Sequence, residues 1–255
     1  MSVSYGRKAV LSIKSLLIFF VRVFFKIYFG VFGRPKINSN LRKVLRLYKG
    51  RGFIGDFSLI RIWDAPFETL EKLIPKSGDV VDLGCGDGIL SNYLAVSSRK
   101  RKVLGIELNK NRVREADRGL KNSKFIQGNI LQKNFSKSDA IVLTHVLHHL
   151  TSYGDQEKLL RKCRQNLKRG GKLVITEIIE RPILKFLFSA LTDIIIVPVL
   201  FSGKLIDTEI HYRSFSGWKK FLENEGFKYS YEIMHKGMPF CHVIFVASIG
   251  RKNQQ

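Results

Sequence analysis

The sequence has few acidic residues and few cysteines. The first shortage limits the kinds of partner that the protein can bind, and the second limits the kinds of metal site that it can form. Its 255 residues hold 21 Asp and Glu against 44 Lys and Arg, a formal net charge of +23 at pH 7. Such an excess favours a partner with an anionic surface, either nucleic acid or acidic lipid. The three cysteines, at positions 85, 163 and 241, lie far apart and match no familiar metal-binding spacing. We therefore expect no cysteine metal site, and a reducing, cytoplasmic compartment.

Acidic residues are absent from the first 55 positions, which carry twelve Lys and Arg. About half of the net charge thus falls in the first fifth of the chain, which is unlike ordinary protein surface. We interpret residues 1–52 as a basic segment with a linker, residues 53–249 as one domain and residues 250–255 as a polar tail. The apolar content of 45% is typical of a globular protein and excludes general disorder.

Residues 9–33 form a strongly apolar run that is interrupted by Lys14, Arg22 and Lys26. On a helix, Arg22 and Lys26 fall on one side, which predicts an amphipathic helix with a basic stripe. A membrane span needs about 20 apolar residues, and each cation near its middle costs roughly 2.5 to 3.5 kcal/mol. Because basic residues flank the run on both sides, we expect the helix to lie in the inner, cytoplasmic face of an anionic membrane. A single spanning helix over residues 10–33 and a helix packed on the domain are the alternatives.

Residues 35–52 look like a linker that becomes a second basic helix. Its apolar positions, Leu41, Val44, Leu45 and Leu47, alternate with cations. Three interpretations stay open for this helix: it lies on anionic headgroups, it binds RNA or it is simply solvated.

The clearest signature is a strand followed by alternating glycines. A short apolar run over residues 80–83 predicts a buried parallel strand, and Gly84, Gly86 and Gly88 predict a tight turn before the next helix. Glycines at such a turn let a ligand lie against bare main chain. The segment Val-Asp-Leu-Gly-Cys-Gly-Asp-Gly, residues 81–88, closely resembles the first motif of class I S-adenosylmethionine-dependent methyltransferases, and it lacks the G-x-G-x-x-G spacing of dinucleotide-binding proteins. The alternative is a structural glycine turn in another α/β protein.

This resemblance runs through linked motifs over residues 53–177 and, more loosely, to residue 249. It implies an α/β fold, a seven-stranded Rossmann-like sheet with the N-terminal amphipathic helical extension, and S-adenosylmethionine as the cofactor. In the family, an acid that ends the second strand binds the ribose hydroxyls, and Glu107 resembles it. After the third strand the family commonly has Gly-Asp, whereas this chain has Asn129, whose amide oxygen still accepts a hydrogen bond. The cofactor site implied by the resemblance consists of Asp82, Gly84, Cys85, Gly86, Gly88, Glu107, Leu108, Asn129, Ile130 and Thr144.

Three histidines follow the predicted fourth strand, residues 140–143, in a Thr-His-Val-Leu-His-His segment. Similar strand ends occur in family members that act on small molecules and lipids. His145 stands where open α/β sheets bind ligands, so its imidazole is a candidate general base, with packing against the cofactor or turn capping as alternatives. His148 is a second catalytic candidate and His149 a substrate-binding one, and we expect at most one of these two to face the site. No third ligand follows at a recognisable spacing, so we expect no metal.

The segment from Pro182 to Phe201 is almost entirely apolar, with charges only at Lys185 and Asp193. In the family, the region between the fifth and sixth strands commonly covers the acceptor, so this segment suits a lipophilic substrate or helps the N-terminal helix dock in a bilayer. A buried core helix and a second membrane span are the alternatives. His211 and Tyr212, in the loop that follows, are further candidates for substrate contact.

Together these features predict an S-adenosylmethionine-dependent methyltransferase that acts on a lipophilic or membrane-associated small molecule. The predicted acceptor is a lipid, a quinone-like ring or a polyketide or polyene product. We expect its methylation to take place at the cytoplasmic membrane face and to need no metal. The alternatives are an RNA methyltransferase and a non-catalytic binding protein that retains the fold. The chain lacks an RNA-recognition signature, an Asn/Asp-Pro-Pro-Tyr turn and a Pro-Cys nucleophile, so we do not expect a nucleic-acid partner.

Overall fold

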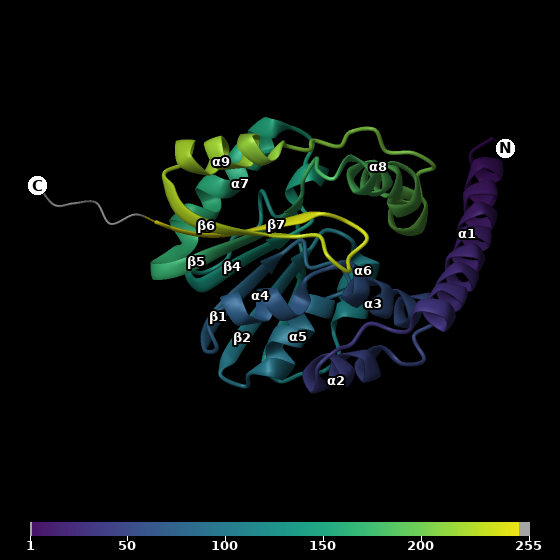
Figure 1. The fold of residues 1–255 in the computed structure, drawn as a ribbon, viewed down its shortest axis with the longest axis horizontal. Coiled ribbons are helices and arrows are strands. Elements are labelled where there is room, and N and C mark those ends of the chain that lie inside the picture. The colour runs from purple at the N-terminus through teal and green to yellow at the C-terminus, as the bar shows by residue number, and fades with distance from the viewer. Residues whose placement is uncertain (1, 250–255) are drawn as a thin grey trace, which may run out of the picture.

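A computed structural model describes the backbone of residues 2–249 and the side chains of residues 11–249. Within this range the chain is organised around one seven-stranded sheet with the order β3-β2-β1-β4-β5-β7-β6 (Figure 1). The five strands from β3 to β5 run parallel, and β7 pairs antiparallel with both β5 and β6. This arrangement confirms the predicted seven-stranded Rossmann-like sheet. The strands are β1 (Gly78–Leu83), β2 (Arg101–Glu107), β3 (Ser123–Gln127), β4 (Ser138–Thr144), β5 (Leu167–Ile178), β6 (Phe227–Met234) and β7 (His242–Ile249).

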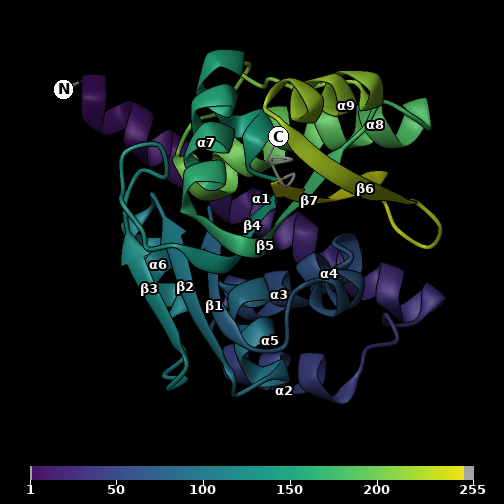
Figure 2. The ribbon, with the colours of Figure 1, turned by 90° about the vertical axis from the view of Figure 1, so that its left-hand side faces the viewer.

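The central strands are buried on both faces, which is why their sequences are apolar throughout. In β1, Val81 and Leu83 point into one core layer, whereas Val80 points into the other. The first layer lies under α7 (Tyr153–Asn166) and α9 (Phe215–Asn224), and the second under α3 (Phe53–Asp64), α4 (Phe67–Leu73) and α5 (Ile89–Ser97). Figure 2 shows the helices on the two sides of the sheet.

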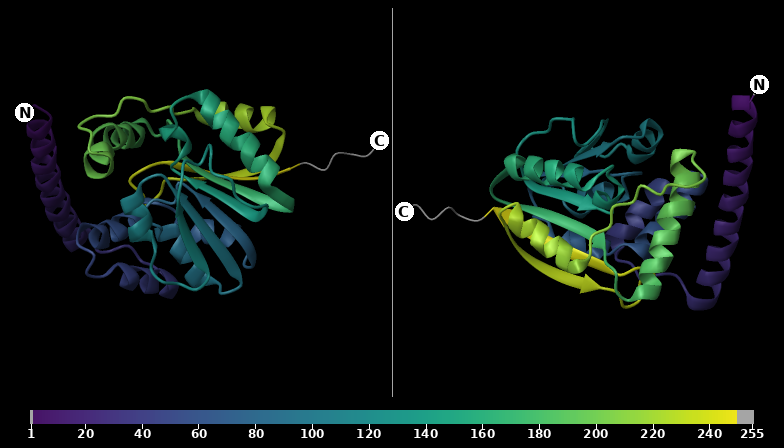
Figure 3. Two further views of the ribbon diagram at one scale, coloured as in Figure 1. Left: turned by 180° about the vertical axis from the view of Figure 1, so that it is seen from behind. Right: turned by 90° about the horizontal axis from the view of Figure 1, so that it is seen from above.

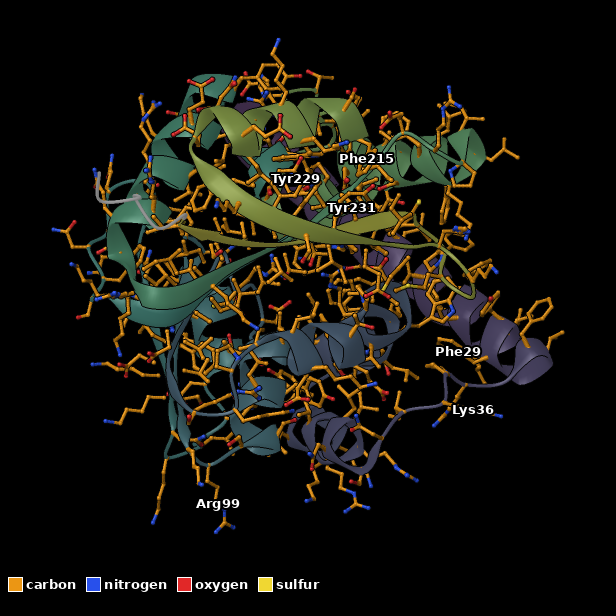
Figure 4. The ribbon with its side chains drawn as sticks, turned by 60° about the vertical axis from the view of Figure 1, so that its left-hand side comes forward. Phe29, Lys36, Arg99, Phe215, Tyr229 and Tyr231 are labelled. Atoms are coloured by element: carbon orange, nitrogen blue, oxygen red, sulfur yellow. The ribbon has the colours of Figure 1, made fainter. Side chains whose placement is uncertain are left out.

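Aromatic side chains fix α9 over the antiparallel edge of the sheet. The ring centroid of Phe215, at the start of α9, lies 4.9 Å from that of Tyr231 on β6, and Tyr229 lies on the same strand (Figure 4). Helix α6 (Lys110–Ala116) follows β2.

The N-terminal residues form two helices with different surroundings. Helix α1 (Ser2–Phe32) stands along one side of the domain (Figures 1 and 3), and its Tyr28 ring lies 5.2 Å from Trp63 of α3. Helix α2 (Ser39–Tyr48) instead buries Leu41, Val44 and Tyr48 in the second core layer. Helix α2 therefore packs as part of the globular domain, whereas our interpretation of the sequence placed it in the basic segment, residues 1–52. The predicted polar tail, residues 250–255, lies outside the described residues.

The apolar segment after β5 forms α8 (Ile183–Leu191) and continues through two π-helical turns, η2 (Thr192–Ile196) and η3 (Pro198–Ser202). The C-terminal end of this segment contacts helix α3, where the ring centroid of Phe57 lies 5.0 Å from that of Phe201. By length and composition alone, two described stretches could cross a membrane, Leu11–Phe32 and Ile183–Ser202.

Candidate active site

The glycine turn after β1 has a backbone that only glycine adopts without strain. Gly84, Gly86 and Gly88 have φ values of +72°, +56° and +73°. A Cβ at Gly84 would lie 2.7 Å from the side chain of Val146, and one at Gly88 would lie 2.6 Å from Ala116. The turn is tied to β2, since the Gly84 amide donates to the carbonyl oxygen of Ile106 at 2.8 Å. The three glycines therefore let the turn pack closely at the carboxyl end of the central strands, the edge where open α/β sheets bind ligands.

Glu107 ends β2 directly beside this turn. Its carboxylate accepts hydrogen bonds from the backbone amides of Gly86, at 3.0 Å, and Asn109, at 2.8 Å. Each oxygen keeps a further lone pair, so the carboxylate still has acceptor capacity for ribose hydroxyls. Beneath the turn, burial raises the pKa of Asp82 to about 6, although the Ser91 hydroxyl donates to it at 2.5 Å. Asn129 follows β3, and its side-chain oxygen accepts from the Leu131 amide at 2.9 Å.

Two residues that the sequence analysis did not single out as ligands also lie at the glycine turn. The Arg112 guanidinium donates to both carboxylate oxygens of Asp87, at 3.2 and 2.9 Å, and a Cβ at Gly86 would lie 2.5 Å from its Nη2. The ring of Phe201, from η3, lies 4.5 Å from this guanidinium. The apolar segment after β5 thus reaches the predicted cofactor turn. No local motif marks these contacts, because they join residues from three separate elements.

The structure fixes both ring nitrogens of His145, the predicted base. Its Nε2 lies 2.9 Å from Nδ1 of His242, whose Nε2 lies 2.8 Å from the carbonyl oxygen of Asp64. Since a carbonyl only accepts, His242 donates through Nε2 and accepts at Nδ1, so His145 donates through its own Nε2. The remaining Nδ1 faces Nη2 of Arg61 at 3.3 Å and accepts from it. Burial, His242 and Arg61 together hold the pKa of His145 well below its usual value.

His148 lies deeper, in the short 3-10 turn η1 (Leu147–His149), and is fully buried. Its Nδ1 lies 2.5 Å from Glu177 of β5, whose other oxygen accepts from the backbone amides of Val146, at 3.2 Å, and Leu147, at 2.8 Å. On the opposite side, Nε2 of His148 lies 3.5 Å from the carboxylate of Asp193 on η2. Burial alone would lower the pKa of His148, but Glu177 and Asp193 outweigh it and raise that pKa to about 10.

His149 and Tyr212 complete this group of side chains. Nε2 of His149 lies 3.9 Å from Oδ1 of Asp193, and the Tyr212 hydroxyl donates to Oδ2 of the same carboxylate. The Tyr212 ring stacks on His148 with its centroid 4.9 Å away. His211 contributes its backbone amide, which donates to the His148 carbonyl at 2.8 Å, while its ring packs against Tyr153. We call His148, His149, Glu177, Asp193 and Tyr212 the histidine–carboxylate cluster.

The structure therefore brings three of the predicted residues together around a carboxylate that the sequence does not mark as functional. Asp193 is an isolated acid in an apolar helix, and Glu177 is the next-to-last residue of the buried strand β5. Neither has a motif spacing to the histidines. The cluster lies at the carboxyl ends of β4 and β5, the same edge of the sheet as the glycine turn.

Comparison with known proteins agrees with this geometry. A family model described as a methyltransferase domain matches residues 81–175, from β1 to β5. The demethylmenaquinone methyltransferase of Thermotoga maritima is 26% identical over 164 residues, which cover 60% of this chain and 71% of that protein. Ribosomal RNA small subunit methyltransferase C of Chromohalobacter salexigens is 29% identical over 153 residues, 57% of this chain but only 39% of that protein. Human N-acetylserotonin methyltransferase, solved with its cofactor, superposes with a TM-score of 0.58 at 20% identity, covering 88% of this chain and 62% of that one.

The sheet order, the glycine turn and the carboxylate that ends β2 define a Rossmann-like methyltransferase. Residues 81–175 match a methyltransferase domain, and the chain has the fold of the class I S-adenosylmethionine-dependent methyltransferases. The residues present fit S-adenosylmethionine as the cofactor: Glu107 accepts from the Gly86 amide of the glycine turn and keeps lone pairs for the ribose hydroxyls.

Proposed function

We propose that this methyltransferase acts on a lipophilic small molecule, a lipid, a quinone-like ring or a polyketide or polyene product, which it takes from the cytoplasmic face of a membrane. The observation that carries the proposal is the double contact of the α8–η3 segment. On one side the segment exposes large apolar side chains to solvent, and on the other it contributes Asp193 to the histidine–carboxylate cluster and Phe201 to the glycine turn.

Large exposed apolar side chains are concentrated on two helices. On α8 and η2 the exposed side chains are Ile183, Leu184, Leu187, Phe188, Leu191 and Ile195. On α1 they are Leu11, Ile13, Leu16, Phe19, Phe20, Val23, Phe24, Ile27, Val31 and Phe32. Exposed apolar patches beyond a few hundred Å² usually mark a membrane or a partner. Cations lie on and beside α1, including Lys14, Arg34 and Lys36, which favours an anionic bilayer (Figure 4 labels Phe29 on α1 and Lys36 just after it).

Catalysis in this proposal depends mainly on placement of the acceptor. The bound cofactor supplies a methyl group that its sulfonium already activates. The glycine turn and Glu107 orient the cofactor, and the histidine–carboxylate cluster lines the acceptor side. Correct orientation of two reactants contributes roughly 7 to 11 kcal/mol to barrier lowering. A substrate that enters from the bilayer along α8 would reach this position without crossing water.

Two of the relatives support different acceptors. The name of the Thermotoga relative supports a quinone-like ring, and the name of the Chromohalobacter relative supports ribosomal RNA. The apolar surface beside the cluster favours the first, because RNA recognition uses exposed polar and stacking side chains.

The test combines vesicle binding with methyl transfer. Wild-type protein should float with vesicles that contain phosphatidylglycerol, and should transfer labelled methyl groups into a lipid extract. Changing Leu184→Glu and Phe188→Glu together should reduce flotation at least about tenfold, because two charges would enter the apolar region. The matched control, Gln132→Glu with Asn134→Glu, adds the same charge on an exposed loop and should float like wild type. Salt-sensitive binding to ribosomal RNA without flotation would replace this proposal with the RNA methyltransferase.

A further inference from the structure

We propose that His148, His149 and Asp193 bind a divalent metal ion, with Zn²⁺ as the best match to their chemistry. The inference goes beyond the proposed acceptor, and it revises the expectation of no metal from the sequence. The side-chain donor atoms of these three residues all lie within 4.8 Å of one another. Nε2 of His148 lies 3.5 Å, and Nε2 of His149 3.9 Å, from the Asp193 carboxylate.

These separations are close to those of a tetrahedral zinc site. With bonds of about 2.0 to 2.1 Å to nitrogen and oxygen, tetrahedral ligands stand roughly 3.3 to 3.4 Å apart. Rotation of the His149 ring, whose side chain is 35% exposed, would close the remaining gap. Two imidazoles and one carboxylate form a ligand set that zinc uses in catalytic sites, and a fourth position stays open for water or another oxygen ligand.

His148 is already oriented as a metal ligand. Its Nδ1 bonds to Glu177, and Glu177 is itself held by the amides of Val146 and Leu147. A carboxylate on one ring nitrogen directs the other toward a metal, as in carboxylate–histidine–zinc arrangements. The Nε2 atom of His148 is buried and makes no hydrogen bond; the polar atom that faces it, at 3.5 Å, is the Asp193 carboxylate oxygen. This nitrogen therefore points into the proposed site, where a metal ion would replace the proton that Glu177 and Asp193 hold on the imidazole.

Asp193 is placed by an irregular helix. It lies in the π-helical turn η2, and such turns occur frequently at functional sites. The Tyr212 hydroxyl donates to the Asp193 carboxylate and so limits its rotation. Asp193 follows His149 by 44 residues, in an apolar helix with no other acid. Spacing in the sequence could not identify it as a third ligand.

The decisive measurement is metal binding by the full chain, purified in detergent and stripped with a chelator. We expect one equivalent of Zn²⁺ to bind in competition with a chromophoric chelator, and Co²⁺ to give the visible absorption of a four-coordinate site. His149→Ala, at a partly exposed position, should weaken Zn²⁺ binding at least about a hundredfold, and Asp193→Asn should do the same. Glu177→Gln should weaken it about 10- to 100-fold. The matched control, His235→Ala, removes a histidine outside the cluster and should bind like wild type.

Failure to bind one equivalent of Zn²⁺, or binding that His149→Ala and Asp193→Asn leave unchanged, would overturn the metal site. In that case His148 is a protonated bridge between Glu177 and Asp193. Thermal melts of each variant confirm that loss of binding is not loss of folding. The proposed acceptor is judged separately, because flotation and methyl transfer into lipid need no metal measurement: zinc binding without flotation and without lipid methylation would overturn the acceptor proposal and support this inference.

Discussion

The ring nitrogens of His145 show how tertiary contacts restrict a side chain that the sequence favours as a base. Arg61 occupies one nitrogen and His242 the other, and His145 has a φ of +55°. A general base needs a free lone pair near the acceptor's proton. In this geometry the imidazole instead connects the end of β4 to α3 and β7.

His145→Asn tests the two roles. Asn tolerates positive φ, so the backbone is retained, but His242 loses its hydrogen-bond donor. We expect a loss of roughly 1 to 3 kcal/mol in unfolding free energy, measured by urea denaturation, and less than a tenfold fall in turnover. A larger fall in turnover with unchanged stability and unchanged cofactor affinity would identify His145 as the base after all.

Glu107 is the residue on which cofactor binding should depend most. Its carboxylate organises two backbone amides at the glycine turn and has lone pairs left for the ribose. Glu107→Ala should weaken S-adenosylmethionine binding at least about tenfold in calorimetric titration, because charged hydrogen bonds contribute about 1.5 to 3 kcal/mol. Glu115→Ala, on the nearby α6, is the control and should bind normally. Equal affinity in the Glu107 variant would remove this residue from the cofactor site.

Asp82 makes stability depend on pH. Burial raises its pKa in the folded state to about 6, above the value of about 3.9 in an unfolded chain. The folded state therefore holds this proton more tightly, and the contribution of Asp82 to stability is lost as pH rises from about 4 to about 6. Asp82→Asn removes the buried charge, so it should be more stable than wild type by about 2 to 3 kcal/mol at pH 7.5, and by almost nothing at pH 4. Urea denaturation at both pH values measures this difference; a variant that is no more stable at pH 7.5 would contradict it.

At the scale of elements, α2 and α8 show what a helical pattern leaves open. The apolar positions of α2 suit a membrane surface and a protein core equally well, and the fold buries them against α5. The Tyr48 hydroxyl at its end donates to the Asp87 carbonyl at 2.6 Å, so the helix also supports the glycine turn. For the segment that begins with α8, the apolar composition predicts a cover over a lipophilic acceptor, but only the π-helical turn η2 decides that Asp193 faces the cluster.

For the molecule as a whole, the proposed action on an acceptor from the membrane depends on two features. These are the apolar helices α1 and α8, and the edge of the sheet that holds the glycine turn and the histidine–carboxylate cluster. The α1 helix contacts the domain through its C-terminal half, where Arg22 pairs with Asp56 at 2.7 Å and Tyr28 packs on Trp63. The net charge of +23 adds attraction to an anionic bilayer, and salt screens this attraction without removing the apolar contribution. In the flotation experiment, high salt should therefore weaken vesicle binding only in part.

The sequence by itself determined the order of strands and helices, the glycine turn and the acid that ends β2. These features depend on local physics: apolar runs form buried strands, and only glycine adopts successive positive φ values without strain. The structure confirmed the sheet that follows from them. The partners of the histidines were decided by the tertiary structure alone. Arg61, Glu177, Asp193 and His242 come from four different elements, and side-chain contacts between distant segments depend on packing that no local pattern records.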